Sequence, residues 1–191
     1  MATMSISLVG VGGQGTLLTS EILARTAVFA GCDVKKSEVH GMAQRGGSVI
    51  SQVRFGEKVY SPIVSEGQSD VLVAFEKLEA LRWRNLLKTG GKALVNDLEI
   101  IPVTVSSGQH LALADAGGQL RETYSDLTVI NAQAIAQELG NIRTANMVLA
   151  GALSRLTPFE ASCWEQALRE RIPAKLLDIN LKAFELGMSA G

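Results

Sequence analysis

One early segment most limits how this chain folds: a short apolar run that passes through glycines into an amphipathic stretch. Residues 7–15 are SLVGVGGQG, and apolar residues then recur at helical spacing through residue 23. This order predicts a strand, a tight turn and a helix. Gly10, Gly12 and Gly15 match the G-x-G-x-x-G spacing, in which glycine allows the turn, close approach of an anion, and close helix–strand packing. Unpaired N–H groups at such a helix start favour negative charge.

Strand-like and helix-like segments alternate along the rest of the chain. We expect strands at 5–9, 34–39, 71–75, 93–96 and 127–130, and helices at 14–30, 78–87, 131–139, 144–156 and 174–186. This alternation predicts an α/β fold, Rossmann-like and doubly wound, with a mostly parallel sheet. An inserted β-hairpin of 48–55 with 58–60 is expected after the second strand. No linker or repeat is evident, so residues 1–191 are interpreted as a single domain.

A second glycine-bearing loop, residues 40–47, follows the second expected strand. Loops at the carboxyl ends of adjacent parallel strands face one crevice, so this loop is expected beside residues 10–15. Arg45 carries a planar fork that suits phosphate or carboxylate, and the glycines beside it permit close backbone approach. The candidate binding residues, with no catalytic or metal residue assigned, are Gly10, Gly12, Gly13, Gln14, Gly15, His40, Gly41, Gln44, Arg45, Gly46 and Gly47.

Plainer interpretations of these residues stay open. The glycines at 12, 13 and 15 could serve only helix–strand packing, because the fingerprint is degenerate. Arg45 could be a solvated loop charge. His40 fits a structural role better than a catalytic one, because Glu38 is the only obvious partner nearby in sequence.

The sequence lacks the residues that several classes of protein need for their function. A dinucleotide dehydrogenase usually places an acidic residue at the end of the second strand, and neither Asp33 nor Glu38 falls at a suitable position. There is no Gly-x-Ser-x-Gly elbow, no P-loop lysine and no His/carboxylate metal spacing. Cys32 and Cys163 are far apart and belong to no C-x-x-C, so this chain cannot hold a four-cysteine cluster. The residues indicate an anion- or partner-binding domain without its own catalytic centre.

The charge and hydropathy of the chain indicate which partners and which cellular location to expect. The net charge of −1 argues against binding to nucleic acid or a membrane surface. No apolar run approaches the roughly 18–20 residues that span a bilayer. The first residues, Met-Ala-Thr-Met, lack the basic and apolar parts of a signal peptide, which favours a cytoplasmic protein.

Two segments together resemble one family. The sequences GVGGQG at 10–15 and SEVHGMAQRGGSV at 37–49 closely resemble the gamma domain of 2-oxoacid:ferredoxin oxidoreductases. The nearest resemblance is to the small (beta) subunits of indolepyruvate:ferredoxin oxidoreductases. DVLVAFE at 70–76 and NMVLAGAL at 146–153 match further patterns of the family, so the resemblance covers nearly the whole chain.

The resemblance implies a non-catalytic subunit of a complex that decarboxylates a 2-oxoacid and forms an acyl-coenzyme A. Thiamine diphosphate and iron–sulfur clusters would belong to a larger partner subunit, and electrons would leave to ferredoxin. It also suggests that the two loops shape the assembly and the route of coenzyme A. Separately, we hypothesise that Arg45 and the helix start contact the phosphates of coenzyme A.

Two other functions remain open at this point. The chain could be a free-standing nucleotide- or flavin-binding protein that uses residues 10–15, or an assembly or regulatory module without a ligand. The sequence leaves open which 2-oxoacid the complex uses, whether the isolated chain forms a homo-oligomer, and what residues 106–124 do.

Overall fold

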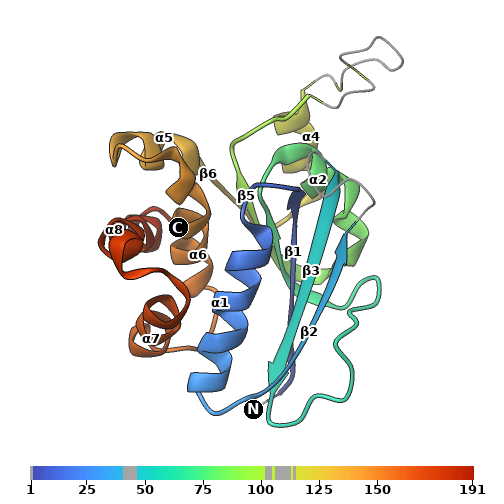
Figure 1. The fold of residues 1–191 in the computed structure, drawn as a ribbon. Coiled ribbons are helices and arrows are strands. Elements are labelled where there is room, and N and C mark those ends of the chain that lie inside the picture. The colour runs from blue at the N-terminus through green and yellow to red at the C-terminus, as the bar shows by residue number, and fades with distance from the viewer. Residues whose placement is uncertain (1, 41–46, 102–104, 106–112, 114) are drawn as a thin grey trace.

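The computed structural model describes residues 2–40, 47–101, 105, 113 and 115–191. Helices and strands alternate through most of these residues (Figure 1). The strands are β1 (Met4–Val11), β2 (Asp33–His40), β3 (Ser48–Gly56), β4 (Ser69–Ala74), β5 (Leu87–Asn96) and β6 (Leu127–Ile130). The α-helices are α1 (Thr16–Phe29), α2 (Lys77–Arg82), α4 (Ala116–Thr123), α5 (Ala132–Glu138), α6 (Ala145–Ser154), α7 (Ala161–Arg171) and α8 (Ala174–Ala190), with 3-10 turns η1 (Arg84–Leu86) and η2 (Ile142–Thr144).

The six strands form one sheet in the order β2-β3-β1-β4-β5-β6. β1, β4, β5 and β6 pair in parallel, whereas β3 is antiparallel to both of its neighbours, β1 and β2. The predicted α/β class and the mostly parallel strand directions are confirmed.

The predicted hairpin partner is wrong. β3 forms its hairpin with β2, in a register that pairs His40 with Val49, and residues 58–60 form no strand. Side-chain hydrogen bonds hold the chain after β3: Arg54 Nη1 donates to Ser61 O at 3.0 Å, and Val59 N donates to Asp33 Oδ2 at 2.9 Å. β3 therefore lies between β1 and β2. The first two strands were expected to be neighbours in the sheet, and they are not.

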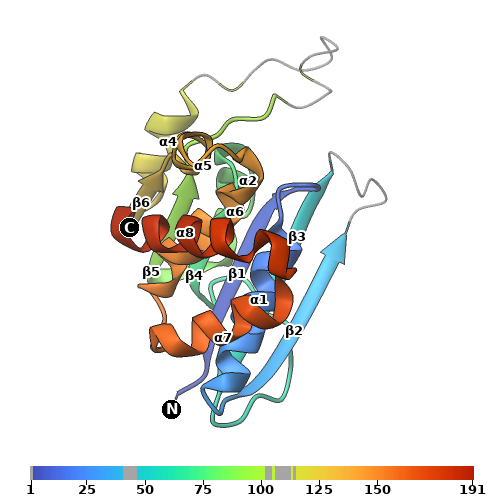
Figure 2. The same ribbon diagram turned by 60° about the vertical axis from the view of Figure 1, so that its left-hand side comes forward.

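Helices cover both faces of the sheet (Figures 1 and 2). One face carries α1, α5 and α6, with α7 packed on α1 and α8 packed on α6, and the other face carries α2 and α4. α6 is buried along its whole length because it lies between the sheet and α8, which explains why its sequence is mostly apolar. Among the described residues, no helix is both long and apolar enough to cross a bilayer.

β1 and β4 are neighbours whose following helices lie on opposite faces. α1 follows β1 and packs on one face, while α2 follows β4 and packs on the other. A doubly wound sheet opens a crevice at the carboxyl ends of two such strands, where ligands commonly bind. The first glycine loop lies at this edge, directly after β1.

Candidate functional site

The two glycine loops are joined by a backbone hydrogen bond. Gly12 N donates to Gly47 O at 2.9 Å, so the described part of the second loop lies beside the first, as predicted. They meet because β3, antiparallel to β1, starts next to the end of β1. The backbone of His40 ends β2. Gly41, Gln44, Arg45 and Gly46, which were predicted as binding residues, lie outside the described residues.

Gln14 fixes the shape of the first loop. Its Oε1 accepts from Val11 N at 2.7 Å, its Nε2 donates to Phe75 O at 3.3 Å, and its own N donates to Val11 O at 3.1 Å. The side chain therefore connects the end of β1 to the end of β4. The backbone N–H groups of Gly12 and Gln14 therefore bond within the protein and are not free to bind a ligand.

Three glycines in this segment have a specific steric or backbone reason. Gly10 lies within β1 rather than in a turn, and a Cβ there would lie 2.7 Å from Gln14 Oε1 and 2.9 Å from Thr16 Oγ1. Gly13 and Gly15 have φ of +105° and +86°, which favour glycine. The expected tight turn at Gly10 is therefore wrong: the turn follows Val11.

The start of α1 is open to a negative charge. Gly15 is its N-cap and offers no side-chain hydrogen bond, and the first turn carries no acidic residue. The first N–H groups of a helix have no partner inside it, and the dipole places partial positive charge there. Thr16, buried to 3% exposure, also has an Oγ1 without a hydrogen-bond partner in the described structure.

Two cavities flank the first loop, and Gly13 and Gly15 contribute to both. The first, here called the α1–β3 cavity, has a volume of about 450 Å³. It is lined by Val11, Gly12, Gly13, Gly15, Thr16, Leu17, Leu18 and Val49. Leucine and valine side chains thus lie beside the open helix start, which gives this cavity an apolar wall next to an anion-favouring end.

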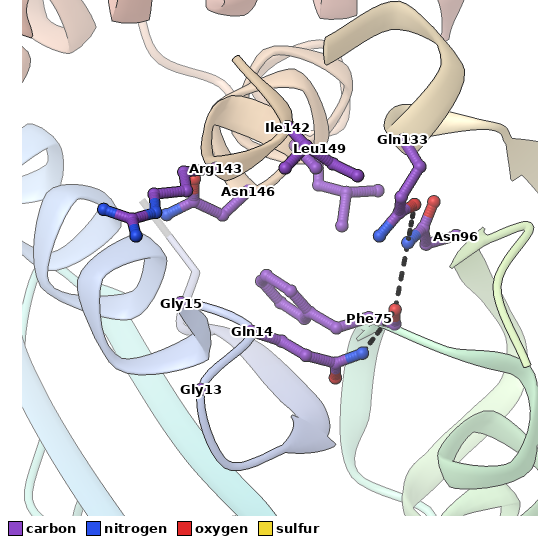
Figure 3. Close-up of a pocket in the computed structure, with 11 residues that line it drawn as sticks. Gly13, Gln14, Gly15, Phe75, Asn96, Gln133, Ile142, Arg143, Asn146 and Leu149 are labelled. Carbon is purple, nitrogen blue, oxygen red and sulfur yellow. Dashed lines mark hydrogen bonds between the residues drawn. The ribbon is translucent and has the colours of Figure 1, made fainter. Parts of the chain in front are cut away.

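The second cavity lies on the other side of the loop, towards α6, and has a volume of about 420 Å³ (Figure 3). We call it the amide cavity, because four of its side chains are amides. Its lining residues are Gly13, Gln14, Gly15, Phe75, Asn96, Gln133, Ile142, Arg143, Ala145, Asn146 and Leu149. They come from the ends of β4 and β5, the first loop, α5, η2 and α6.

An amide network fixes one side of the amide cavity. Phe75 O accepts from both Gln14 Nε2 and Asn96 Nδ2, the latter at 3.0 Å. Asn96 is almost fully buried, and it also donates to Gln133 Oε1 at 2.7 Å and accepts from Ala132 N at 3.0 Å. The Asn96 side chain therefore holds its neighbours in place.

The start of β3, next to the residues that connect it to β2, is linked to α2 by a buried carboxylate. Glu79, 3% exposed, accepts hydrogen bonds from Ser48 Oγ and from Trp83 Nε1, the latter at 3.1 Å. It also forms an ion pair with the exposed Arg82 at 2.9 Å. This contact fixes Ser48, the residue directly after Gly47.

Glu76 is a second buried carboxylate at the end of β4. It caps α2, accepting from Leu78 N at 3.0 Å and from Glu79 N. Burial raises the pKa of the Glu76 carboxyl above its usual 4.5, although these N–H donors oppose the shift. In the described part of the chain, no three His, Cys, Asp or Glu side chains come together as a metal site would need.

Four polar side chains of the amide cavity were not predicted as site residues from the sequence. Asn96, Gln133 and Arg143 belong to no motif, and Asn146 was quoted only as part of a family pattern. Asn96 could have been found from its position, because it ends a predicted strand and ligands of such sheets bind at the carboxyl ends of the strands. Arg143 and Asn146 could not be predicted, because only the packing of α6 against the loop brings them to the cavity.

The fold and these cavities define an α/β protein whose candidate binding surface lies at the carboxyl edge of the sheet, around a glycine loop and a helix start. Comparison with known proteins identifies the family. The model described as "Pyruvate ferredoxin/flavodoxin oxidoreductase" matches residues 5–190, so the chain belongs to this family.

Two proteins illustrate the similarity at nearly full length. The chain is 43% identical over 197 residues to the indolepyruvate oxidoreductase subunit IorB of Thermococcus kodakarensis, covering 100% of this chain and 96% of that one. The keto/oxoacid ferredoxin oxidoreductase gamma subunit of Geobacter sulfurreducens has a solved structure with a TM-score of 0.75 and 25% identity. That match covers 100% of this chain and 97% of the other.

A third match shows the same fold inside a longer protein. The 2-oxoglutarate:ferredoxin oxidoreductase of Magnetococcus marinus, solved with 2-oxoglutarate, coenzyme A and succinyl-CoA bound, has a TM-score of 0.77 and 22% identity. This chain is covered completely but spans only 31% of that one.

Proposed function

We propose that this chain, as one gamma-type domain, is the small subunit of an indolepyruvate-type 2-oxoacid:ferredoxin oxidoreductase in the cytoplasm. The observation that carries the proposal is the 43% identity to an indolepyruvate oxidoreductase subunit across both chains. The partner is a larger subunit that binds thiamine diphosphate and iron–sulfur clusters, and ferredoxin accepts the electrons from the complex. The chain has only two cysteines, and a four-thiolate cluster needs four, which supports placing the clusters on the partner.

We further propose that this subunit contacts coenzyme A through its two glycine loops. Phosphates favour the open start of α1, where Gly15 caps without a side chain. The α1–β3 cavity supplies an apolar wall of Leu17, Leu18 and Val49, which suits the uncharged arm of coenzyme A. Arg45, two residues before Gly47 in the sequence, would add a guanidinium for a phosphate. This chain would then bind and orient the acyl acceptor, while the partner carries out the decarboxylation.

The proposal is tested in the complex reconstituted from this chain and its larger partner. Arg45→Ala should raise the KM for coenzyme A about tenfold and leave kcat nearly unchanged, because it removes binding rather than chemistry. Arg155→Ala, at the far end of α6, is the matched control. An unchanged KM with weaker subunit association would instead favour a ligand-free assembly role.

The subunit assignment has a separate test. The isolated chain should show no flavin or nicotinamide absorbance and no oxidoreductase activity, and it should regain function only with the larger subunit. A tightly bound flavin, or substrate reduction by the isolated chain, would support the free-standing alternative.

A further inference from the structure

We propose that the amide cavity is a second binding site, separate from the α1–β3 cavity, for a small organic oxyanion. The ligand class is a carboxylate or a phosphate monoester attached to an apolar body. Three independent features of the cavity wall support this: an unpartnered buried amide, an unpaired guanidinium, and the open start of α1. The site goes beyond the proposed function, which uses the other side of the loop.

Asn146 is the buried amide that lacks a partner. It is 7% exposed, lies in the first turn of α6, and its side chain makes no hydrogen bond with any described residue. Figure 3 shows it at the cavity wall, above the first loop. Its amide nitrogen and oxygen are not fully enclosed by protein, so they face the open space of the cavity and are free to bond a ligand there. An oxyanion in the cavity would accept from the Asn146 side-chain nitrogen.

Arg143 supplies a full positive charge to the same wall. Its side chain is exposed and forms no ion pair or hydrogen bond within the described structure, whereas Arg25 and Arg169 both pair with glutamates. The residues that line the cavity include no carboxylate that could neutralise it. A guanidinium binds carboxylate and phosphate oxygens through paired N–H groups, which gives both charge and geometry.

The helix start adds to this positive potential. Gly13 and Gly15 line the cavity, and the first N–H groups of α1 lack side-chain caps. The charge of a bound oxyanion would therefore lie between Arg143, on one element, and the positive end of the α1 dipole, on another. Both favour an anion and disfavour a cation.

The opposite wall suits an apolar body. Phe75 and Leu149 are almost fully buried and line the cavity, together with the exposed Ile142. Gln133 lies among them. Because its Oε1 accepts from Asn96, its Nε2 remains a donor, and Figure 3 shows this nitrogen directed into the cavity. A volume of about 420 Å³ is within the range of small-molecule sites.

The test uses the full chain with three probes of similar size: phenyl phosphate, phenylacetate and the uncharged benzyl alcohol. Calorimetry and NMR shifts of the Asn146 side-chain amide report binding. We expect phenyl phosphate, phenylacetate or both to bind at millimolar concentration, and benzyl alcohol not to. The anion that binds more tightly identifies the source of the oxyanion. Equal binding of benzyl alcohol, or no binding of either anion, would overturn the proposal.

Variants locate the site. Arg143→Ala should weaken the anion at least tenfold, Arg143→Lys should recover part of the affinity, and Asn146→Asp should abolish binding by adding a like charge. Arg155→Ala is the control at the other end of α6 and should bind normally. Arg45→Ala should leave probe binding unchanged, which separates this site from the proposed coenzyme A contact. Full affinity in a folded Arg143→Ala protein would place the anion elsewhere.

Discussion

The Asn146 side chain lies directly against Gly15: its Nδ2 is 2.5 Å from the position that a Cβ on Gly15 would occupy. Glycine at this position therefore lets α6 approach the start of α1. The contact also brings the loop and α6 together as walls of one cavity. The third glycine of the fingerprint serves the packing of a distant helix as well as the backbone turn, which requires φ of +86°.

Gly15→Ala should lower the free energy of unfolding by about 2–4 kcal/mol, because it adds both backbone strain and overlap with Asn146. Gly13→Ala is the matched control: φ is also positive there, at +105°, but nothing lies within 4 Å of the added Cβ. That variant should lose only the backbone part, about 1–2 kcal/mol. Urea unfolding measures both, and equal losses would show that the Asn146 contact contributes nothing.

α6 and α8 touch through a reciprocal pair of glycines. A Cβ on Gly151 would overlap Phe184 O, and one on Gly187 would overlap Val148 O, so the two backbones are in contact. Gly151→Ala and Gly187→Ala should each cost about 3 kcal/mol or more, because backbone cannot yield as a flexible side chain does.

Urea unfolding again gives the loss, and hydrogen exchange should show α8 opening first in both variants. Gly117→Ala in α4 is the control, since its Cβ would meet only ordinary contacts near 3.7 Å. It should be neutral or stabilising by up to about 1 kcal/mol. A Gly151→Ala protein as stable as this control would contradict the close helix crossing.

Local pattern was enough to predict most elements of the fold. The apolar run at 71–75, bounded by Asp70 and Glu76, falls almost entirely in the central parallel strand β4, and Asn131 caps α5 by accepting from Ala134 N at 2.9 Å. The hairpin was mispredicted because Gly56-Glu57 resembles a short turn, whereas the strand that forms the hairpin with β3 is β2, on the other side of residues 41–47. Arg54 and Asp33 hold residues 57–63 by side-chain hydrogen bonds, a pattern with no periodic signal.

The position of the candidate site was predictable, but most of its walls were not. Glycine spacing identified the loop at 10–15 and its neighbour, which are joined at Gly12 and Gly47. Arg143 and Asn146 lie about 130 residues from that loop in the sequence, and only the packing of α6 brings them to it. Gln14 was predicted as a ligand residue, and in the structure its side chain lines the amide cavity while bonding to Val11 N and Phe75 O.

Two glutamates should make opposite contributions to the pH dependence of stability. Burial raises the pKa of Glu76 above 4.5, so its stabilising contribution is greatest below pH 4.5 and is lost as pH rises through the folded-state pKa. The hydrogen bond from Lys36 lowers the pKa of Glu21, so that contribution is present above pH 4.5 and is lost as pH falls through the folded-state pKa.

Glu76→Gln should therefore gain stability relative to the wild type as pH rises above 4.5, while Glu21→Gln should lose relative stability as pH rises towards 4.5 and change little above it. Urea unfolding of the three proteins from about pH 3 to pH 7 measures the difference in slope on each side of pH 4.5. The same slope for both variants would contradict the assigned environments.

Glu79 links the start of β3 to α2, and its removal should affect both stability and the proposed binding of coenzyme A. Glu79→Ala removes the buried acceptor of Ser48 Oγ and leaves Trp83 Nε1 with only the Ser48 hydroxyl as acceptor, which should cost about 2–3 kcal/mol. Glu79→Gln keeps an acceptor oxygen and loses mainly the ion pair with Arg82, whose side chain is 57% exposed, so it should cost less than about 1 kcal/mol.

The same pair of variants tests whether the link between α2 and the start of β3 matters for function. Ser48 directly follows Gly47, whose carbonyl accepts from Gly12 N, so releasing Ser48 should loosen the contact between the two loops. In the reconstituted complex, Glu79→Ala should raise the KM for coenzyme A, while Glu79→Gln and Arg82→Ala should stay close to the wild type. If Glu79→Gln is as damaging as Glu79→Ala, the buried charge is essential and the hydrogen bonds alone do not account for the link. If neither variant changes the KM while Glu79→Ala is destabilised, the contact serves folding, and the binding loop is positioned by Gln14 and the Gly12–Gly47 hydrogen bond instead.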